Sequence, residues 1–154
     1  MTVLIRRMTL EDVPAVHEID TLSFSLPWPE RSFRFELTEN PVSRGWVAEV
    51  DSRIAAMLVL WFIIDEAHVA TIAVHPDFRR QGIGEQILLY ALRSAQAEGA
   101  QRAFLEVRAG NVAAQTMYKK YGFEVAGVRR GYYRDNNEDA LLMNLEKFDS
   151  LEAE

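Results

Sequence analysis

The sequence predicts an α/β (α+β) domain with a mixed, mostly antiparallel sheet of about seven strands and about four flanking helices. Two observations lead to this class. Three strand-like apolar segments follow one another within residues 45–74 without a helix between them, as in an antiparallel meander. Residues 82–120 then alternate between helical and strand spacing, and two further strand-like segments close the chain.

The composition suits a single domain. The chain has 154 residues, of which 49% are hydrophobic, enough for a sizeable core. We therefore expect one domain over residues 1–148 and a C-terminal tail over residues 149–154. The absence of Cys excludes disulfides, thiolate metal sites and a Cys nucleophile, and it fits a reducing cytoplasm, where we expect the protein.

Charge and hydropathy exclude two kinds of partner. A formal net charge of −6 argues against general nucleic-acid binding. The longest apolar run, residues 54–64, is too short to cross a bilayer. The three histidines show no metal-ligand spacing, so no metal site is expected.

The first part of the chain reads as a strand and two helices. Residues 3–6 form the strand, and Thr9 is placed to cap the first helix, whose first turn is acidic. The apolar stripe of that helix consists of Val13, Val16, Ile19 and Leu22. The aromatic and Pro-rich segment 24–29 ends it, and a second helix covers about residues 30–39.

The meander comes next. Residues 45–50 and 54–64 read as two strands joined by a tight turn at Asp51-Ser52. A second turn at Asp65-Glu66 leads into a strand over residues 68–74. These three strands are expected to be antiparallel neighbours.

The second half of the chain begins with a long helix over residues 82–99, and Gly99 is its expected C-terminal cap. A strand at 103–108 and a helix at 111–120 follow, and strands at 124–132 and 140–145 pair as a closing hairpin. The long helix has one apolar face, formed by Ile83, Ile87, Leu88, Ala91, Leu92 and Ala95.

A glycine loop, Arg79-Arg-Gln-Gly-Ile-Gly84, connects the third meander strand to the long helix. Gly82 and Gly84 lack Cβ atoms, so the backbone there can approach phosphate oxygens closely. Successive N–H groups at a helix start bind anions, and nearby Arg side chains share the charge. Two glycines at this spacing also occur in plain turns, so the loop alone does not decide between the two interpretations.

The motif Arg79-x-x-Gly82-x-Gly84, preceded by Val-His-Pro, resembles the acetyl-CoA motif of the GNAT N-acetyltransferase superfamily. Nearly the whole chain is similar to the RimI-type branch, the protein N-terminal alanine acetyltransferases that act on a small-subunit ribosomal protein. The supporting residues follow in order: Leu105-Glu-Val-Arg108, Asn111, Met117-Tyr118, Gly122-Phe123, Arg129-Arg-Gly-Tyr-Tyr133 and Glu138-Asp-Ala140.

The resemblance implies a GNAT-like fold with splayed central strands and acetyl-CoA as co-substrate. The pantetheine arm is expected to lie in the gap like an added strand, with the pyrophosphate on the glycine loop. A backbone N–H near Val74 is expected to stabilise the developing oxyanion. The implied cofactor-binding residues are Ile72, Ala73, Val74, Arg79, Arg80, Gln81, Gly82, Ile83, Gly84, Asn111 and Tyr118. From the residues alone, Asn111 is equally well explained as a helix cap.

The resemblance also implies two catalytic residues. Glu106 is expected to act as general base, accepting the proton of the amine through a water molecule. Tyr118 is expected to act as general acid toward the leaving CoA thiolate. Without the resemblance, Glu106 reads as a solvated strand carboxylate and Tyr118 as a core aromatic residue.

Two segments are expected to form the walls of a peptide groove. The implied substrate residues are Leu26, Trp28, Tyr132 and Tyr133, although core packing alone would explain Trp28 and one tyrosine. The sequence departs from the family pattern at Pro29, where Ser or Thr usually follows the Trp. The start of the second helix, and with it the substrate preference, is therefore where the chain is expected to differ from the family pattern.

The expected function is acetyl transfer from acetyl-CoA to a protein N-terminal α-amine, such as that of a ribosomal protein, by a monomer or weak dimer. The amine attacks directly, since no Cys is present and no Ser-His pair stands out as a nucleophile. Two alternatives remain open: a small-molecule or lysine acetyltransferase, and a non-catalytic CoA-binding module.

Overall fold

The computed structural model describes residues 2–148, so the expected tail at 149–154 lies outside it. The predicted class is confirmed: within the described residues, seven strands form one mixed sheet in the order β1-β2-β3-β4-β5-β7-β6. The strands are β1 (Val3–Arg7), β2 (Ser43–Val50), β3 (Arg53–Ile63), β4 (Glu66–Val74), β5 (Arg102–Arg108), β6 (Glu124–Arg129) and β7 (Ala140–Leu145). The helices are α1 (Val13–Ser23), α2 (Glu30–Thr38), α3 (Ile83–Ala97) and α4 (Val112–Lys120), with short 3-10 helices η1 (Leu10–Asp12) and η2 (Pro76–Phe78).

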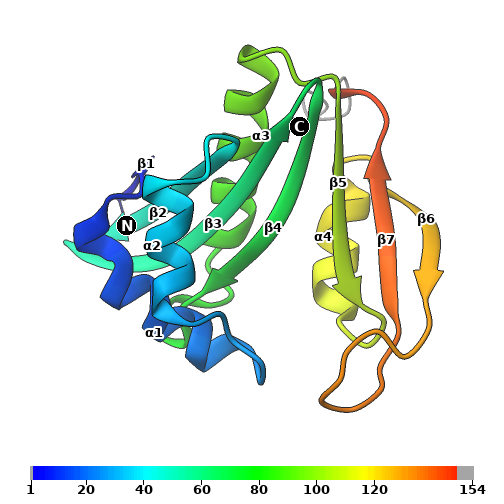
Figure 1. Cartoon of the computed structure of the whole chain (residues 1–154), viewed down its shortest axis with the longest axis horizontal. Coiled ribbons are helices and arrows are strands. Elements are labelled where there is room, and N and C mark those ends of the chain that lie inside the picture. Colours follow the sequence, from blue (N-terminus) through cyan, green and yellow to red (C-terminus); the bar gives the residue numbers. More distant parts are fainter. Residues whose placement is uncertain (1, 149–154) are drawn as a thin grey trace.

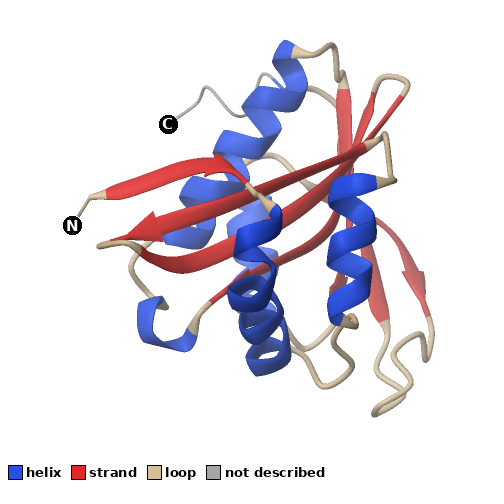
Figure 2. Cartoon of the chain, turned by 60° about the vertical axis from the view of Figure 1, so that its left-hand side comes forward, coloured by secondary structure: helices blue, strands red, loops and turns tan. Residues whose placement is uncertain are grey.

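The helices cover both faces of the sheet. Figure 1 shows α1 and α2 in front of the strands and α3 and α4 behind them, and Figure 2 shows the same layers from the side. Each face has its own apolar core, the larger one beneath α3 and α4. The predicted face of α3 is confirmed, because all six of its residues are buried. No described helix is both long and apolar enough to span a membrane.

The antiparallel meander is confirmed, with β2 paired to β3 and β3 to β4. Its first turn contains Asp51 and Ser52, both at positive φ (50° and 67°), as two-residue hairpin turns require. β1 adds to the free edge of β2 in antiparallel orientation. These strands form a continuous half of the sheet.

The sheet splays between β4 and β5. Among the described strands these two form the one parallel pair, and their register extends only from Glu66–Arg102 to His68–Phe104. Immediately beyond, Ala70 is an extra residue in β4, between the Thr71–Val59 and Val69–Leu60 pairs. Such a bulge bends its strand, and Figure 1 shows β4 and β5 diverging toward their C-terminal ends. The sheet is therefore divided by a V-shaped gap.

Two details differ from the sequence-based expectations. Leu22 is 51% exposed, whereas Asp20 is 1% exposed, so Asp20 completes the buried stripe of α1. The reason is helical geometry, since Asp20 follows the buried Val16 by four residues. The sixth strand ends at Arg129 and does not reach residue 132, because Gly131 (φ 59°) starts an irregular loop.

Candidate active site

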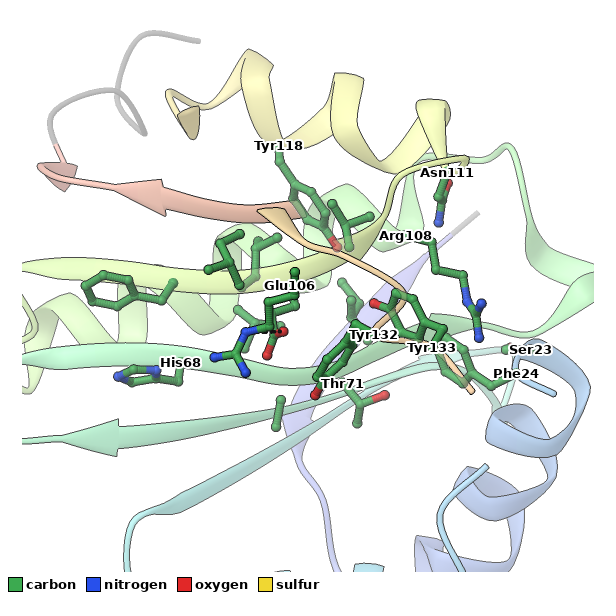
Figure 3. Close-up of a pocket in the computed structure, with 18 of the residues that line it drawn as sticks. Ser23, Phe24, His68, Thr71, Glu106, Arg108, Asn111, Tyr118, Tyr132 and Tyr133 are labelled. Atoms are coloured by element: carbon green, nitrogen blue, oxygen red, sulfur yellow. Dashed lines mark ion pairs between the residues drawn. The ribbon is translucent and has the colours of Figure 1, made fainter. Parts of the chain in front are cut away.

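A cavity of about 800 Å³ follows the gap between β4 and β5 on the side of α1 and α2. Its walls come from both halves of the sheet, from the segment between α1 and α2, and from the loop between β6 and β7 (Figure 3). Eight of the predicted site residues line it: Leu26, Trp28, Ile72, Glu106, Asn111, Tyr118, Tyr132 and Tyr133. The splay thus brings together residues from distant parts of the chain.

β4 directs the backbone groups of alternate residues toward the gap. The N–H of His75 donates to the carbonyl of Ala55 on β3 at 2.8 Å, and every second residue of an antiparallel strand repeats that orientation. Ala73 therefore directs its N–H and C=O toward β3, which differs from the expectation that it faces the cofactor. Ile72 and Val74 direct their backbone groups toward the gap.

β5 presents its free edge from the opposite side. The N–H of Ala109 donates to the carbonyl of Asp139 at 3.0 Å, so Val107 and Leu105 pair with β7. The backbone groups of Glu106 consequently face the gap. An extended chain that carries amide groups can bind between two such edges as an added strand does.

Glu106 lies on the face of β5 that borders the cavity. Its side chain is 36% exposed, and its Oε2 lies 3.5 Å from Nε of Arg129 on β6. The guanidinium of Arg129 in turn lies 5.5 Å from the ring centroid of Tyr132. The carboxylate is therefore open to water and fixed from one side, an arrangement suited to proton transfer through a water molecule.

Tyr118 extends from α4 toward the same space. Figure 3 shows its ring pointing from the helix into the cavity that Glu106 borders. The residue is only 5% exposed and packs on Phe123, with ring centroids 5.8 Å apart. Burial, and to a lesser degree the neighbouring Tyr133, raises the pKa of Tyr118 to about 12. Its hydroxyl therefore carries its proton throughout the neutral range and is a hydrogen-bond and proton donor.

The raised pKa of Tyr118 predicts a loss of folding stability at high pH. The pKa of Tyr118 is higher in the folded chain than the unperturbed value of 10.0, so the unfolded state loses its proton first as the pH rises. Between pH 10 and about pH 12 the free energy of unfolding should fall by about 2–3 kcal/mol more in the wild type than in Tyr118→Phe. Urea unfolding of both proteins at pH 8 and at pH 11 tests this prediction, with a difference of about 1.4 kcal/mol expected by pH 11. Equal pH dependence of the two proteins would contradict the assigned burial of the phenol.

The two predicted substrate walls stand on opposite sides of the gap. The substrate loop, residues 24–29, carries Leu26, which is 58% exposed, and Trp28, whose ring lies 5.2 Å from that of Phe33. The loop between β6 and β7 carries Tyr132 and Tyr133, whose rings meet edge to face at 5.2 Å. An exposed apolar side chain on one wall and a pair of aromatic rings on the other suit contact with a peptide.

Arg108 fixes the second wall. Its guanidinium lies 3.9 Å from the ring centroid of Tyr133 and forms ion pairs with Asp135 at 2.9 Å and Glu138 at 3.2 Å. Glu138 also accepts the N–H of Gly110 at 2.6 Å. One β5 residue therefore ties the loop between β6 and β7 to the sheet.

The glycine loop lies beyond the end of β4 and does not line the cavity. Two residues in it, Arg80 and Gly82, have positive φ (64° and 77°), which turns the chain sharply into α3. Gly84 permits close packing, since a Cβ there would lie 3.2 Å from Cγ2 of Val74. The side chain of Ile83 is buried in the core, so only its backbone is available to a ligand.

Arg79 points away from the glycine loop. Its Nε donates to the carbonyl of Val74 at 3.0 Å, and its Nη2 donates to Oγ of Ser23 at 3.2 Å. Arg79 thus links the end of β4 to the last residue of α1. The side chain of Asn111 accepts the N–H of Ala114 as the expected cap of α4, and the residue lines the cavity, while its contact with the cofactor stays a prediction.

Replacing Gly82 by Val is expected to weaken acetyl-CoA binding while the fold persists. A Cβ at Gly82 meets no atom within 4 Å, but a branched side chain at φ 77° is strained by about 1–2 kcal/mol and crowds the expected phosphate site. Gly99→Val is the matched control, because Gly99 also has positive φ and open space around it, at the opposite end of α3. Calorimetric titration with acetyl-CoA should show at least a tenfold weaker affinity for Gly82→Val alone. Equal affinities would remove the glycine loop from the cofactor site.

Three residues of the site were not identified from the sequence: Arg108, Arg129 and Asp20. The two arginines stand in segments that carry the family resemblance, but nothing in the sequence assigns them a role at the site, and only the folded chain brings them to Tyr133 and Glu106. Asp20 did carry a signal, since an acidic residue four positions after Val16 falls on the apolar face of its helix.

A splayed sheet with two free strand edges, a water-accessible carboxylate and a buried protonated phenol suits an enzyme that binds an extended ligand and carries out acid–base chemistry. Comparison with known proteins identifies the class of enzyme. Residues 13–123 match the model of the acetyltransferase (GNAT) family, so the chain belongs to this family. It is an N-acetyltransferase, and acetyl-CoA is its acetyl donor.

Several relatives share almost the full chain. The Escherichia coli ribosomal protein bS18-alanine N-acetyltransferase is 34% identical over 145 residues, covering 87% of this chain and 90% of that protein. A Bacillus subtilis protein is 42% identical over 139 residues, which cover 90% of this chain and 92% of that protein. Its name is "Putative [ribosomal protein bS18]-alanine N-acetyltransferase". The crystal structure of the E. coli ribosomal-protein alanine N-acetyltransferase superposes with a TM-score of 0.87 at 33% identity, covering 94% of this chain and 93% of the other.

Proposed function

We propose that this enzyme acetylates the α-amine at the N-terminus of a protein, with an N-terminal alanine of a ribosomal protein as the substrate class. The relatives that cover nine-tenths of the chain carry names with this activity, which supports the assignment. We further propose that it acts in the cytoplasm as a monomer or weak dimer, and the net charge of −6 supports a protein partner over a nucleic acid.

The observation that carries the proposal is the pairing of Glu106 and Tyr118 in one cavity at the splay. Ile72 and Val74 would bind the pantetheine amides along the free edge of β4, and residues 80–84 would receive the pyrophosphate. Bound there, acetyl-CoA supplies an activated thioester carbonyl. The unpaired N–H of Val74 is the expected donor to the carbonyl oxygen as negative charge develops on it.

The reaction needs proton transfers at nitrogen and at sulfur. An α-ammonium group has a pKa of about 7.7–8.0, so it first loses one proton to solvent to give the neutral amine that attacks. Glu106 takes the second nitrogen proton, through water, as the C–N bond forms. The C–S bond breaks, and Tyr118 donates its proton to the departing sulfur and then recovers one from solvent. No covalent enzyme intermediate is required.

The shape of the cavity favours a chain end as the substrate. Aromatic and apolar side chains of the substrate loop and of the loop between β6 and β7 flank the entrance from opposite sides, with Leu26 and Tyr132 the most exposed. A peptide N-terminus can enter between these walls and place its amine near Glu106, while the following residues lie along the aromatic rings.

A peptide panel tests the assignment. One peptide begins with Ala and contains no Lys, a second has the same sequence with a blocked N-terminus and one internal Lys, and spermidine represents small amines. We expect acetylation of the first peptide with a kcat/KM at least about 10²-fold above the others, since only it presents a chain end to both walls. Preferred acetylation of the Lys peptide or of spermidine would overturn the N-terminal assignment in favour of those substrate classes. If the protein releases no CoA from acetyl-CoA with any of the three amines, the interpretation as a CoA-binding module would be favoured.

A further inference from the structure

Asp20 is a buried acidic residue whose role is not explained by catalysis. It lies in the last turns of α1, is 1% exposed and lines the cavity. Its Oδ2 accepts the backbone N–H of Trp28 at 2.7 Å, and no other hydrogen bond to its carboxyl group is found within residues 2–148. Burial, partly offset by that hydrogen bond, raises the pKa of Asp20.

Burying a carboxyl group at this position is unfavourable for the free energy of folding. The other buried residues of α1 are the apolar Val13, Val16 and Ile19, and another aliphatic side chain would complete the stripe without loss of hydration. A single hydrogen bond does not compensate fully for burying a carboxylate. The stability of α1 therefore does not explain why an acidic residue occupies position 20. The explanation lies in the group that Asp20 binds, the backbone N–H of Trp28.

Asp20 holds both ends of the substrate loop. Its backbone carbonyl accepts the N–H of Phe24 at 3.0 Å where α1 ends, and its side chain accepts the N–H of Trp28 just before α2 begins. The cap position of α2 is Pro29, which makes no side-chain cap hydrogen bond. Asp20 therefore fixes Trp28, the residue just before this cap position, from outside α2.

The substrate loop is the wall that carries Leu26 and Trp28. Between its two tied ends the loop bulges toward the cavity, and Phe24 and Leu26 are both exposed there (37% and 58%). If the N–H of Trp28 lost its acceptor, the loop would still be held at its α1 end, by the hydrogen bond that Ser25 donates to Asp135, and by the packing of Trp28 on Phe33, but its α2 end would lose its backbone anchor. The position of this wall would then vary, while β4, β5 and the glycine loop would be unaffected.

We propose that Asp20 is a positioning residue that sets the substrate loop in place, and thereby determines the affinity for the acceptor peptide and not for acetyl-CoA. This inference rests on the proposed function, because it takes residues 24–29 as the wall of the peptide groove. The chemistry required of residue 20 is a hydrogen-bond acceptor of the length of Asp, and its negative charge is not needed.

The test compares Asp20→Ala with Asp20→Asn. Asparagine keeps an acceptor oxygen at the same reach, so its KM for an Ala-starting peptide should stay within about twofold of wild type. Alanine removes the acceptor, and KM for the peptide should rise about fivefold to thirtyfold, with the acetyl-CoA affinity unchanged. Asp12→Ala is the matched control, since Asp12 is also buried and accepts a backbone N–H, from Thr9 at 2.7 Å, at the other end of α1. Its peptide KM should not rise.

Amide hydrogen exchange provides a readout that does not depend on the substrate. In Asp20→Ala, segment 24–29 should exchange at least about tenfold faster than in wild type and in Asp20→Asn. Unchanged exchange in that segment would overturn the anchoring role. Faster exchange with an unchanged peptide KM, or a KM increase shared by Asp12→Ala, would overturn the link between anchoring and peptide binding. If wild type does not acetylate the peptide, the proposed function fails, whereas the exchange result still decides whether Asp20 anchors the loop.

Discussion

Replacing Glu106 with Gln should lower kcat for peptide acetylation by about 10²–10⁴-fold. Glutamine has the same shape, but its side chain does not accept a proton, so the attacking amine must lose its proton to bulk solvent. The affinity for acetyl-CoA should stay near that of wild type, because the cofactor contacts are expected from backbone groups of β4 and the glycine loop. Steady-state rates of CoA release and calorimetric titration measure the two quantities.

Glu124→Gln is the control for a change of charge on an exposed strand glutamate. Glu124 lies on β6 and does not line the cavity, so its variant should turn over at the wild-type rate. Arg129→Ala adds a second check, because it removes the ion pair but leaves the carboxylate of Glu106 in place. A Glu106→Gln protein with wild-type kcat would show that another group, or solvent alone, accepts the proton.

The second large effect is expected for Tyr118→Phe, with a kcat lower by about 10²–10⁴-fold. Phenylalanine fills the same buried space against Phe123 but does not donate a proton to the leaving sulfur. Tyr121→Phe is the matched control. Tyr121 lies on the same helix, is 1% exposed and donates its hydroxyl to Glu85, away from the cavity lining. Its variant should lose stability and keep its turnover.

A thioester with a better leaving group sharpens this test. If Tyr118 protonates the sulfur, the rate of Tyr118→Phe should depend more steeply on the pKa of the leaving thiol than the rate of wild type. Equal dependence in the two proteins, together with an unchanged kcat for CoA, would assign Tyr118 to packing alone.

The regular elements were predictable because they depend on short-range patterns. The meander strands are apolar runs that end at turn residues such as Asp51 and Ser52, and the buried face of α3 repeats at helical spacing. The splay of β4 from β5 was expected from the family resemblance, but no local sequence pattern specified it. That feature depends on a bulge at Ala70 and on the loss of pairing after His68, both of which require the neighbouring strands to be in place.

The candidate site was predicted largely through the family resemblance, and the structure adds what the resemblance lacked. Glu106, Asn111 and Tyr118 lie on one cavity, but no local pattern identifies Arg129 as the ion-pair partner of Glu106. Backbone orientation is equally invisible in a sequence. Only the hydrogen-bond alternation in β4 shows that Ile72 and Val74 face the gap and that Ala73 faces β3.

The most direct measurement of the proposed activity is mass spectrometry of protein N-termini in cells with and without this gene. We expect one or a few proteins with an N-terminal alanine, a ribosomal protein among them, to carry an α-N-acetyl group only when the gene is present. A gene encoding Glu106→Gln should fail to restore that modification, whereas Glu124→Gln should restore it. N-terminal acetylation that is identical in both strains, with a difference confined to lysine side chains or small amines, would contradict the proposed function.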